Sequence, residues 1–174
     1  MRRALAADGY DAVTIEGLAA EAGVSKQTIY RWWPSKAAIL GEALLEGALP
    51  GLDPERQFTT DLAADLRGWF GAASKNQTSA ENVEIARALI AVTATDPELG
   101  AALNRRFADP IVSWIVARIT RAVDEGVVRA DADPAVVADL FVAATSYATL
   151  LGRPLTADRV DGLVELILRG IAVG

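Results

Sequence analysis

The sequence predicts an all-α protein of about nine helices, on three observations. Val and Ile residues recur at helical rather than alternating spacing, so no stretch has the pattern of a strand. Four Asp-Pro pairs are spread along the chain, and each joins a good N-cap to a proline suited to the first turn of a helix. Hydrophobic residues make up 52% of the 174 residues, which is enough for a substantial buried core.

Capping residues place the helices in order along the chain. Thr14 and Ser25 are expected to cap two short helices, Gly23 to end the first of them, and Gly126 to end a longer helix. Thr156 is expected to cap the last helix, in which apolar residues line one face. The expected helices cover residues 1–8, 15–22, 26–32, 35–48, 55–73, 79–94, 97–123 with a break near Pro110, 134–151 and 157–172.

Residues 24–36, "VSKQTIYRWWPSK", concentrate cationic, polar and aromatic side chains. They follow the glycine turn that joins two short helices, and this arrangement is a helix-turn-helix. Ile29 and Trp33 are four residues apart and are expected to face inward with Val24. The side chains left outside are of the types that contact bases and phosphates in a major groove. They are Lys26, Gln27, Thr28, Tyr30, Arg31 and Trp32.

The charge distribution agrees with a nucleic-acid partner for this part of the chain. The net charge is −6, but residues 1–40 carry five bases and four acids, whereas residues 41–174 carry 12 bases and 19 acids. A slightly basic head on an acidic body is expected if only the head meets a polyanion. A Pro/Gly cluster at 49–54 offers a hinge behind this head.

Composition also excludes several kinds of chemistry. The chain has no cysteine and no histidine, which removes disulfides, thiolate nucleophiles, histidine bases and nearly every zinc or haem site. We therefore expect no metal and no other cofactor. An enzyme would have to work with carboxylates, lysines, hydroxyls or a borrowed cofactor, and we expect no enzymatic activity. No signal peptide is evident, and Asp139 and the many alanines of 134–151 favour a helix buried between helices over a membrane span. We expect a soluble, cytoplasmic protein.

A resemblance makes the helix-turn-helix prediction more specific. Residues 9–40, "GYDAVTIEGLAAEAGVSKQTIYRWWPSKAAIL", resemble the DNA-binding head of TetR-family transcriptional regulators, and "VRADADPAVVADLFVAATSYATLLGRPL" resembles a loop and the penultimate helix of that family's regulatory domain. The chain departs from the family at its N-terminus, where Met1 is expected to lie inside the first helix already, so that either leading residues precede it or the first helix is short. The resemblance implies base contacts by Lys26, Gln27, Thr28, Arg31 and Trp32, and phosphate contacts by Thr14, Tyr30 and Lys36.

The resemblance further implies a homodimeric repressor that binds a palindromic operator and responds to a small molecule. We expect a DNA-binding domain at residues 1–46 and a helical ligand-binding and dimerisation domain at 47–174. The last two helices are expected to form the dimer interface, because the first of them is apolar on too many faces for the surface of a monomer. The expected interface residues are Ala143, Ala144, Ala148, Leu150, Leu163 and Ile167.

Aromatic residues in the second domain are candidates for lining a site for a small, mainly apolar effector. The same rings at helical spacing are commonly ordinary core residues, and both interpretations stay open here. Arg87 lies in an apolar run and would need a partner if it were buried. The candidate ligand-binding residues are Trp69, Phe70, Arg87, Trp114, Phe141 and Tyr147.

Two other classes of function are compatible with parts of the sequence. An enzyme could use the carboxylate pairs Asp61 with Asp65 and Glu81 with Glu84, which lie at helical spacing. Nothing beside them marks a nucleophile or a metal set. A helical interaction module without DNA binding is the second alternative, and the intact set of exposed cationic and polar residues after Ser25 argues against it.

Overall fold

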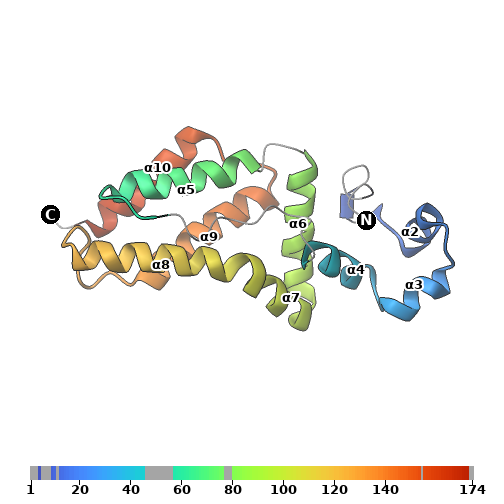
Figure 1. Cartoon of the computed structure of the whole chain (residues 1–174). Helices are drawn as coiled ribbons and strands as arrows, with labels where there is room; N and C mark the ends of the chain where they lie inside the picture. The colour runs from blue at the N-terminus through green and yellow to red at the C-terminus, as the bar shows by residue number, and fades with distance from the viewer. Residues whose placement is uncertain are drawn as a thin grey trace. The chain divides into compact units, whose positions relative to one another are not determined.

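The computed structural model describes residues 4, 9–10, 12–45, 57–76, 80–153 and 155–172, without the side chains of 72–76 and 80–82. All regular secondary structure in these residues is helical, and Val128 and Ala172 form an isolated antiparallel bridge. None of the helices in the described ranges is long and apolar enough to span a membrane. The helices (Figure 1) are α2 (Ile15–Ala22), α3 (Lys26–Trp32), α4 (Lys36–Ala43), α5 (Leu62–Asn76), α6 (Ala80–Thr95), α7 (Pro97–Leu103), α8 (Asp109–Asp124), α9 (Pro134–Leu150) and α10 (Ala157–Ile171).

Most of the predicted caps are present at the predicted helix ends. Thr14, Ser25, Asp133 and Thr156 each accept a backbone N–H from the first turn of the helix that follows. Gly126 ends α8 with a φ of 72°, in the left-handed region that favours glycine. Capping groups act over only a few residues, so they can be recognised in the sequence. The bounds of α2 and α3 predicted from them are confirmed. The expected first helix, 1–8, lies outside the described residues except for Ala4.

Two predicted helices differ from the structure. The helix expected from residue 55 begins at Leu62, because residues 57–61 are not helical and Asp61 accepts the N–H of Ala64 and so acts as its cap. The long helix expected over 97–123 breaks as predicted near Pro110. Its parts, α7 and α8, are separated by a π-helical turn at Asn104–Ala108, since Pro110 has no N–H to continue the helical hydrogen bonds.

The chain divides into two compact units, residues 1–51 with 79–106, and residues 52–78 with 107–174. The predicted domain boundary after residue 46 lies outside the described residues. In the first unit α4 packs on α6 and α7. This packing leaves no room at Gly41, where a methyl group would overlap the side chain of Leu99.

The second unit is built from α5, α8, α9 and α10. Helix α8 packs against both α9 and α5, and α10 packs against α5. The core between them is mainly aliphatic and contains four stacked rings: Phe70 stacks on Phe141 with 4.5 Å between ring centroids, and Trp69 stacks on Trp114 at 6.0 Å. This ring cluster joins three of the four helices.

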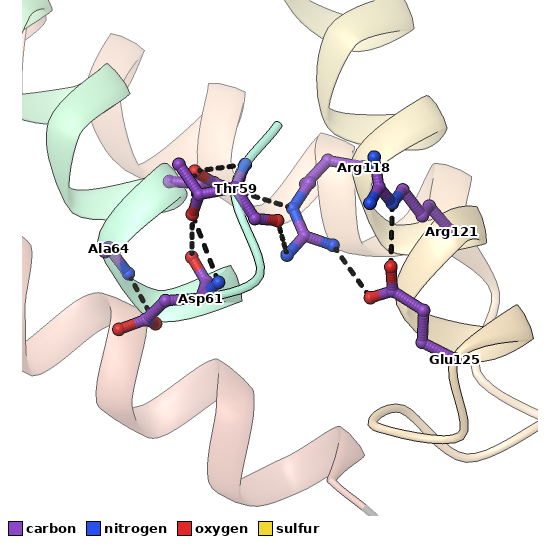
Figure 2. A network of polar contacts seen from close by, with 7 residues as sticks. Thr59, Asp61, Ala64, Arg118, Arg121 and Glu125 are labelled. Carbon is purple, nitrogen blue, oxygen red and sulfur yellow. Dashed lines mark hydrogen bonds and ion pairs between the residues drawn. The ribbon is translucent and has the colours of Figure 1, made fainter. Parts of the chain in front are cut away.

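A buried ion pair ties α8 to the start of α5 (Figure 2). Arg118 is fully buried, and its Nε donates to Oδ2 of Asp65 at 2.6 Å. The carboxylate of Asp65 also accepts the hydroxyl of Thr59 at 2.8 Å and its backbone N–H at 3.0 Å. The carboxylate of Asp65, one of the pair that an enzyme could have used, is therefore buried and occupied by these contacts. Its engagement weakens the enzyme alternative.

Candidate nucleic-acid interface

The helix-turn-helix is held by caps on both of its helices. Thr14 accepts the N–H of Gly17 at 3.1 Å, and Ser25 accepts the N–H of Thr28 at 3.1 Å. Gly23 joins the helices with a φ of 68°, which lets the N–H of Val24 reach back into α2. The turn therefore sets the direction of α3 through backbone geometry that the sequence encodes locally.

Helix α3 presents one face inward and the rest to solvent. Ile29 is its buried residue, and at about 100° per residue Gln27 and Arg31 lie on the opposite side. Lys26 and Tyr30 lie along one flank of that outer face. All six predicted DNA contacts on this helix are exposed, namely Lys26, Gln27, Thr28, Tyr30, Arg31 and Trp32.

The cations on this surface are held by neighbouring groups. Lys26 forms an ion pair with Glu16 of α2, and its Nζ lies 5.7 Å from the centroid of the Tyr30 ring. The hydrogen bond from Lys26 lowers the pKa of Glu16, and the same bond raises the pKa of Lys26. The guanidinium of Arg31 lies 5.5 Å from the Trp32 ring, which is 67% exposed. Both cations are thus oriented before any DNA is bound.

The residues predicted to touch phosphates have different surroundings. Tyr30 is exposed, and Thr14 is exposed while its hydroxyl caps α2. The Nζ of Lys36 donates to the backbone carbonyls of Tyr10 at 2.8 Å and Val13 at 3.2 Å. Lys36 therefore fastens the start of α4 to the segment before α2, and its phosphate contact stays a prediction.

The inward packing of the motif differs in part from the expectation. Val24 was expected to face inward but is 42% exposed. Trp33 is half-buried, and its indole N–H donates to Glu42 at 2.9 Å, so the ring lies at the margin of the core. Trp32 and Trp33 both line an open apolar groove of about 520 Å³ beside Ile29.

The candidate ligand-binding residues do not all come together. Trp69, Phe70, Trp114 and Phe141 are buried against one another in the core of the second unit. Tyr147 is instead 61% exposed on α9. Arg87 belongs to the first unit, where it pairs with Glu84 at 2.8 Å. The four buried rings have a structural role here, and their part in ligand binding stays a prediction.

The predicted interface residues on α9 and α10 divide into two groups. Leu150 and Ala143 are exposed and Ala144 and Leu163 half-buried, whereas Ala148 and Ile167 are buried within their own unit. A groove of about 610 Å³ is lined by residues of both helices. Sequence reasoning missed its exposed apolar residues, which are Val136, Leu140 and Leu166.

Leu166 could have been found from the helical wheel of α10. The stripe from Val160 to Ile171 accounts for the buried face, and Leu166 lies off that stripe. An apolar residue outside the buried stripe is a signal for a second contact surface.

The capped turn and the exposed cationic and polar face of α3 define a helix-turn-helix DNA-binding protein. Two family models match the chain: "Bacterial regulatory proteins, tetR family" over residues 2–43, and "Tetracyclin repressor-like, C-terminal domain" over residues 57–167. The chain belongs to the TetR family and is a DNA-binding transcriptional regulator. The resemblance seen in the sequence is thereby confirmed.

Individual relatives agree with this assignment. The chain is 32% identical over 161 residues to the DNA-binding transcriptional repressor TetR of Mycobacteroides abscessus, covering 92% of this chain and 84% of the relative. It is 29% identical over 165 residues to the uncharacterized HTH-type transcriptional regulator YdeS of Bacillus subtilis, covering 94% of this chain and 81% of the relative. Both are similar over nearly the whole of this chain.

Solved structures show the same architecture. The TetR family transcription regulator SCO0332 has a TM-score of 0.61 and 28% identity, covering 99% of this chain and 94% of that chain. The TetR family transcriptional regulator PfmR of Thermus thermophilus has a TM-score of 0.69 and 23% identity, covering 97% of this chain and 94% of that chain. The all-α prediction with a helix-turn-helix head is confirmed.

Proposed function

We propose that this chain is a ligand-responsive repressor that binds a palindromic operator as a homodimer in the cytoplasm. The proposal of operator binding rests on the outer face of α3, where Gln27 and Arg31 lie opposite the buried Ile29. Arginine pairs with guanine and glutamine with adenine in the major groove. The similarity to a DNA-binding transcriptional repressor of Mycobacteroides abscessus supports repression.

Dimerisation is supported by the unpartnered apolar residues of α9 and α10. Leu140 and Leu166 are 52% and 72% exposed and line the same groove. A second copy related by a two-fold axis would cover both grooves with equivalent helices. Each dimer would then offer two α3 helices to half-sites about one turn of DNA apart.

The structure indicates which residues should be charged to test this interface. Ile167 is buried in its own unit, so a charge there would damage the fold of one subunit rather than the dimer. Leu150 and Leu166 are exposed, and a charge at either is tolerated by the isolated subunit. They are the appropriate sites for an assembly test.

For a ligand to control DNA binding, a structural change in the expected ligand-binding domain, residues 47–174, must reach the helix-turn-helix. Helix α4 follows α3 in the chain and packs on α6 and α7. The contact at Gly41 has no spare room, and a Cβ at Gly100 would lie 2.7 Å from the carbonyl oxygen of Thr93. Such close packing transmits a displacement instead of absorbing it. A mainly apolar effector that shifts α6 or α7 would therefore shift α4, and by linkage DNA would oppose effector binding equally.

The test is selection of bound sequences from a random DNA pool, followed by fluorescence anisotropy over a salt series. A palindromic sequence should be enriched, and its affinity should fall steeply as salt rises. Lys36→Ala should weaken binding to every sequence and lower the salt slope by about one per half-site. If purified protein shows no salt-sensitive binding to DNA, the proposal fails.

The effector is sought separately, by a thermal-shift screen of apolar metabolites. Each compound that stabilises the protein is then titrated into the protein bound to its selected operator. An effector should lower operator affinity. A tightly bound compound that leaves operator affinity unchanged would contradict the proposed coupling for that site.

A further inference from the structure

The ion pair between Glu16 and Lys26 connects the two helices of the DNA-binding motif. Glu16 is the second residue of α2, Lys26 is the first residue of α3, and the two are ten residues apart in the chain. Both side chains are exposed. The exposed pairs Arg169–Glu165 and Arg121–Glu125 instead join residues four apart on one helix, where they are ordinary surface contacts.

We propose that Glu16 and Lys26 together recognise one G·C base pair in each half-site, which makes Glu16 a specificity-determining residue. The inference rests on the proposed binding of an operator by α3. In helix-turn-helix proteins the N-terminal residues of the second helix contact base edges. Lys26 stands at that end of α3, so its partner Glu16 is brought to the same end.

The chemistry of the pair matches one base pair. A carboxylate accepts the N4 amino group of cytosine, and a lysine donates to O6 or N7 of guanine. Cytosine N4 and guanine O6 are neighbours on the major-groove edge of a G·C pair. The ion pair places an acceptor and a donor next to each other, as such an edge requires.

A phosphate contact by Lys26 is less compatible with the structure. The ammonium would have to leave Glu16, and the carboxylate would then face the polyanionic backbone without a partner. Lys26 is also held against the Tyr30 ring on its own helix. Because the intact pair is neutral, it adds nothing to the sequence-independent attraction between the head and DNA.

The experiment compares the unmodified protein with Glu16→Ala, Lys26→Met, the double variant of both and the control Glu165→Ala. Each variant is taken through selection from the same random pool, and affinities for the selected operator and its single-base variants are measured over a salt series. Far-UV circular dichroism melts check that each variant is folded. Glu165 is a matched control because it is an exposed, ion-paired glutamate on α10.

We expect Glu16→Ala and Lys26→Met to lose the preference for G·C at the same position of each half-site. The loss should be roughly fivefold to a hundredfold per half-site, while preferences elsewhere in the operator remain. The double variant Glu16→Ala with Lys26→Met should keep the salt slope of the unmodified protein, because a neutral pair is removed as a whole and no phosphate contact is lost. Glu165→Ala should select the original sequence.

Three results would overturn the inference. If Glu16→Ala selects the original operator with unchanged preferences, Glu16 does not contact bases. If the double variant weakens binding to all sequences equally and lowers the salt slope by about one per half-site, Lys26 contacts phosphate. If the unmodified protein selects no sequence at all, the proposed operator binding itself fails. This result differs from the first two, in which the protein still selects an operator but Glu16 or Lys26 does not act as proposed.

Discussion

Replacing Leu166 by glutamate should dissociate the proposed dimer without unfolding the subunit. Leu166 is 72% exposed on α10, so a charge there is solvated in an isolated chain. In a dimer that covers the groove between α9 and α10, the same carboxylate would be removed from water next to Leu140 and Val136. The substitution should therefore raise the free energy of the dimer and leave that of the isolated subunit nearly unchanged.

The size of the effect follows from the exposed fraction. Full burial of a leucine side chain is worth about 1.5–3 kcal/mol, so covering the exposed 72% of Leu166 contributes roughly 1–2 kcal/mol. Two-fold symmetry buries the residue twice, which gives about 2–4 kcal/mol per dimer. Loss of this term alone should raise the dimer dissociation constant by roughly thirtyfold to several hundredfold.

Sedimentation equilibrium measures this change directly, and a circular dichroism melt reports whether the subunit is still folded. Binding to a full operator should fall with dimerisation, whereas binding to a single half-site should change little. Val127→Glu is the matched control, because Val127 is an exposed valine of the same unit that does not line the groove. A Leu166→Glu protein that remains a dimer at micromolar concentration would refute the assignment of this surface.

Three further predictions follow from the described contacts. Arg31→Ala should abolish operator preference, at about 1–3 kcal/mol per half-site by anisotropy, and leave the melting temperature unchanged because the side chain is exposed. Asp65→Asn should lower the free energy of unfolding by about 3–5 kcal/mol in urea denaturation, since it removes the carboxylate nearest the buried Arg118 charge and leaves only that of Glu125 at 4.0 Å, whereas replacement of both Asp65 and Arg118 by apolar residues should cost less. The pKa of Glu16 is lowered and that of Lys26 is raised by their hydrogen bond, so the pair stays charged across the neutral range. Its contribution is lost only as pH falls through the lowered pKa of Glu16 or rises through the raised pKa of Lys26. The chain has no histidine, so operator affinity should be constant between about pH 6 and 9, and a change of more than a few fold across that range would contradict this account.

Features that depend on near neighbours were predictable. The bounds of α2 and α3 follow from Thr14, Gly23 and Ser25, because capping and a left-handed turn involve groups only a few residues away. The exposed face of α3 follows from helical periodicity about Ile29. These local rules also carried the family resemblance, since its motif lies in one continuous stretch.

Features that depend on distant residues were not predictable in the same way. The sequence singled out Arg87 as an arginine in an apolar run, but the buried one is Arg118, which is held by Asp65 from 53 positions away. The start of α5 also depends on this network, because Thr59 bonds to Asp65 and keeps the preceding segment out of the helix. Helical spacing gave no means of choosing between the two arginines.

The sequence by itself determined that the chain is helical, that it carries a helix-turn-helix, and which side chains of α3 face outward. Only the tertiary structure decided that Trp69 and Trp114 stack in the core, that Ile167 is buried while Leu166 is exposed, and that Glu16 meets Lys26. The physical reason is that caps and periodicity act over one or two turns of chain. Burial and ion pairing instead depend on which helices pack together, and that is set by the sum of many weak contacts between residues far apart in sequence.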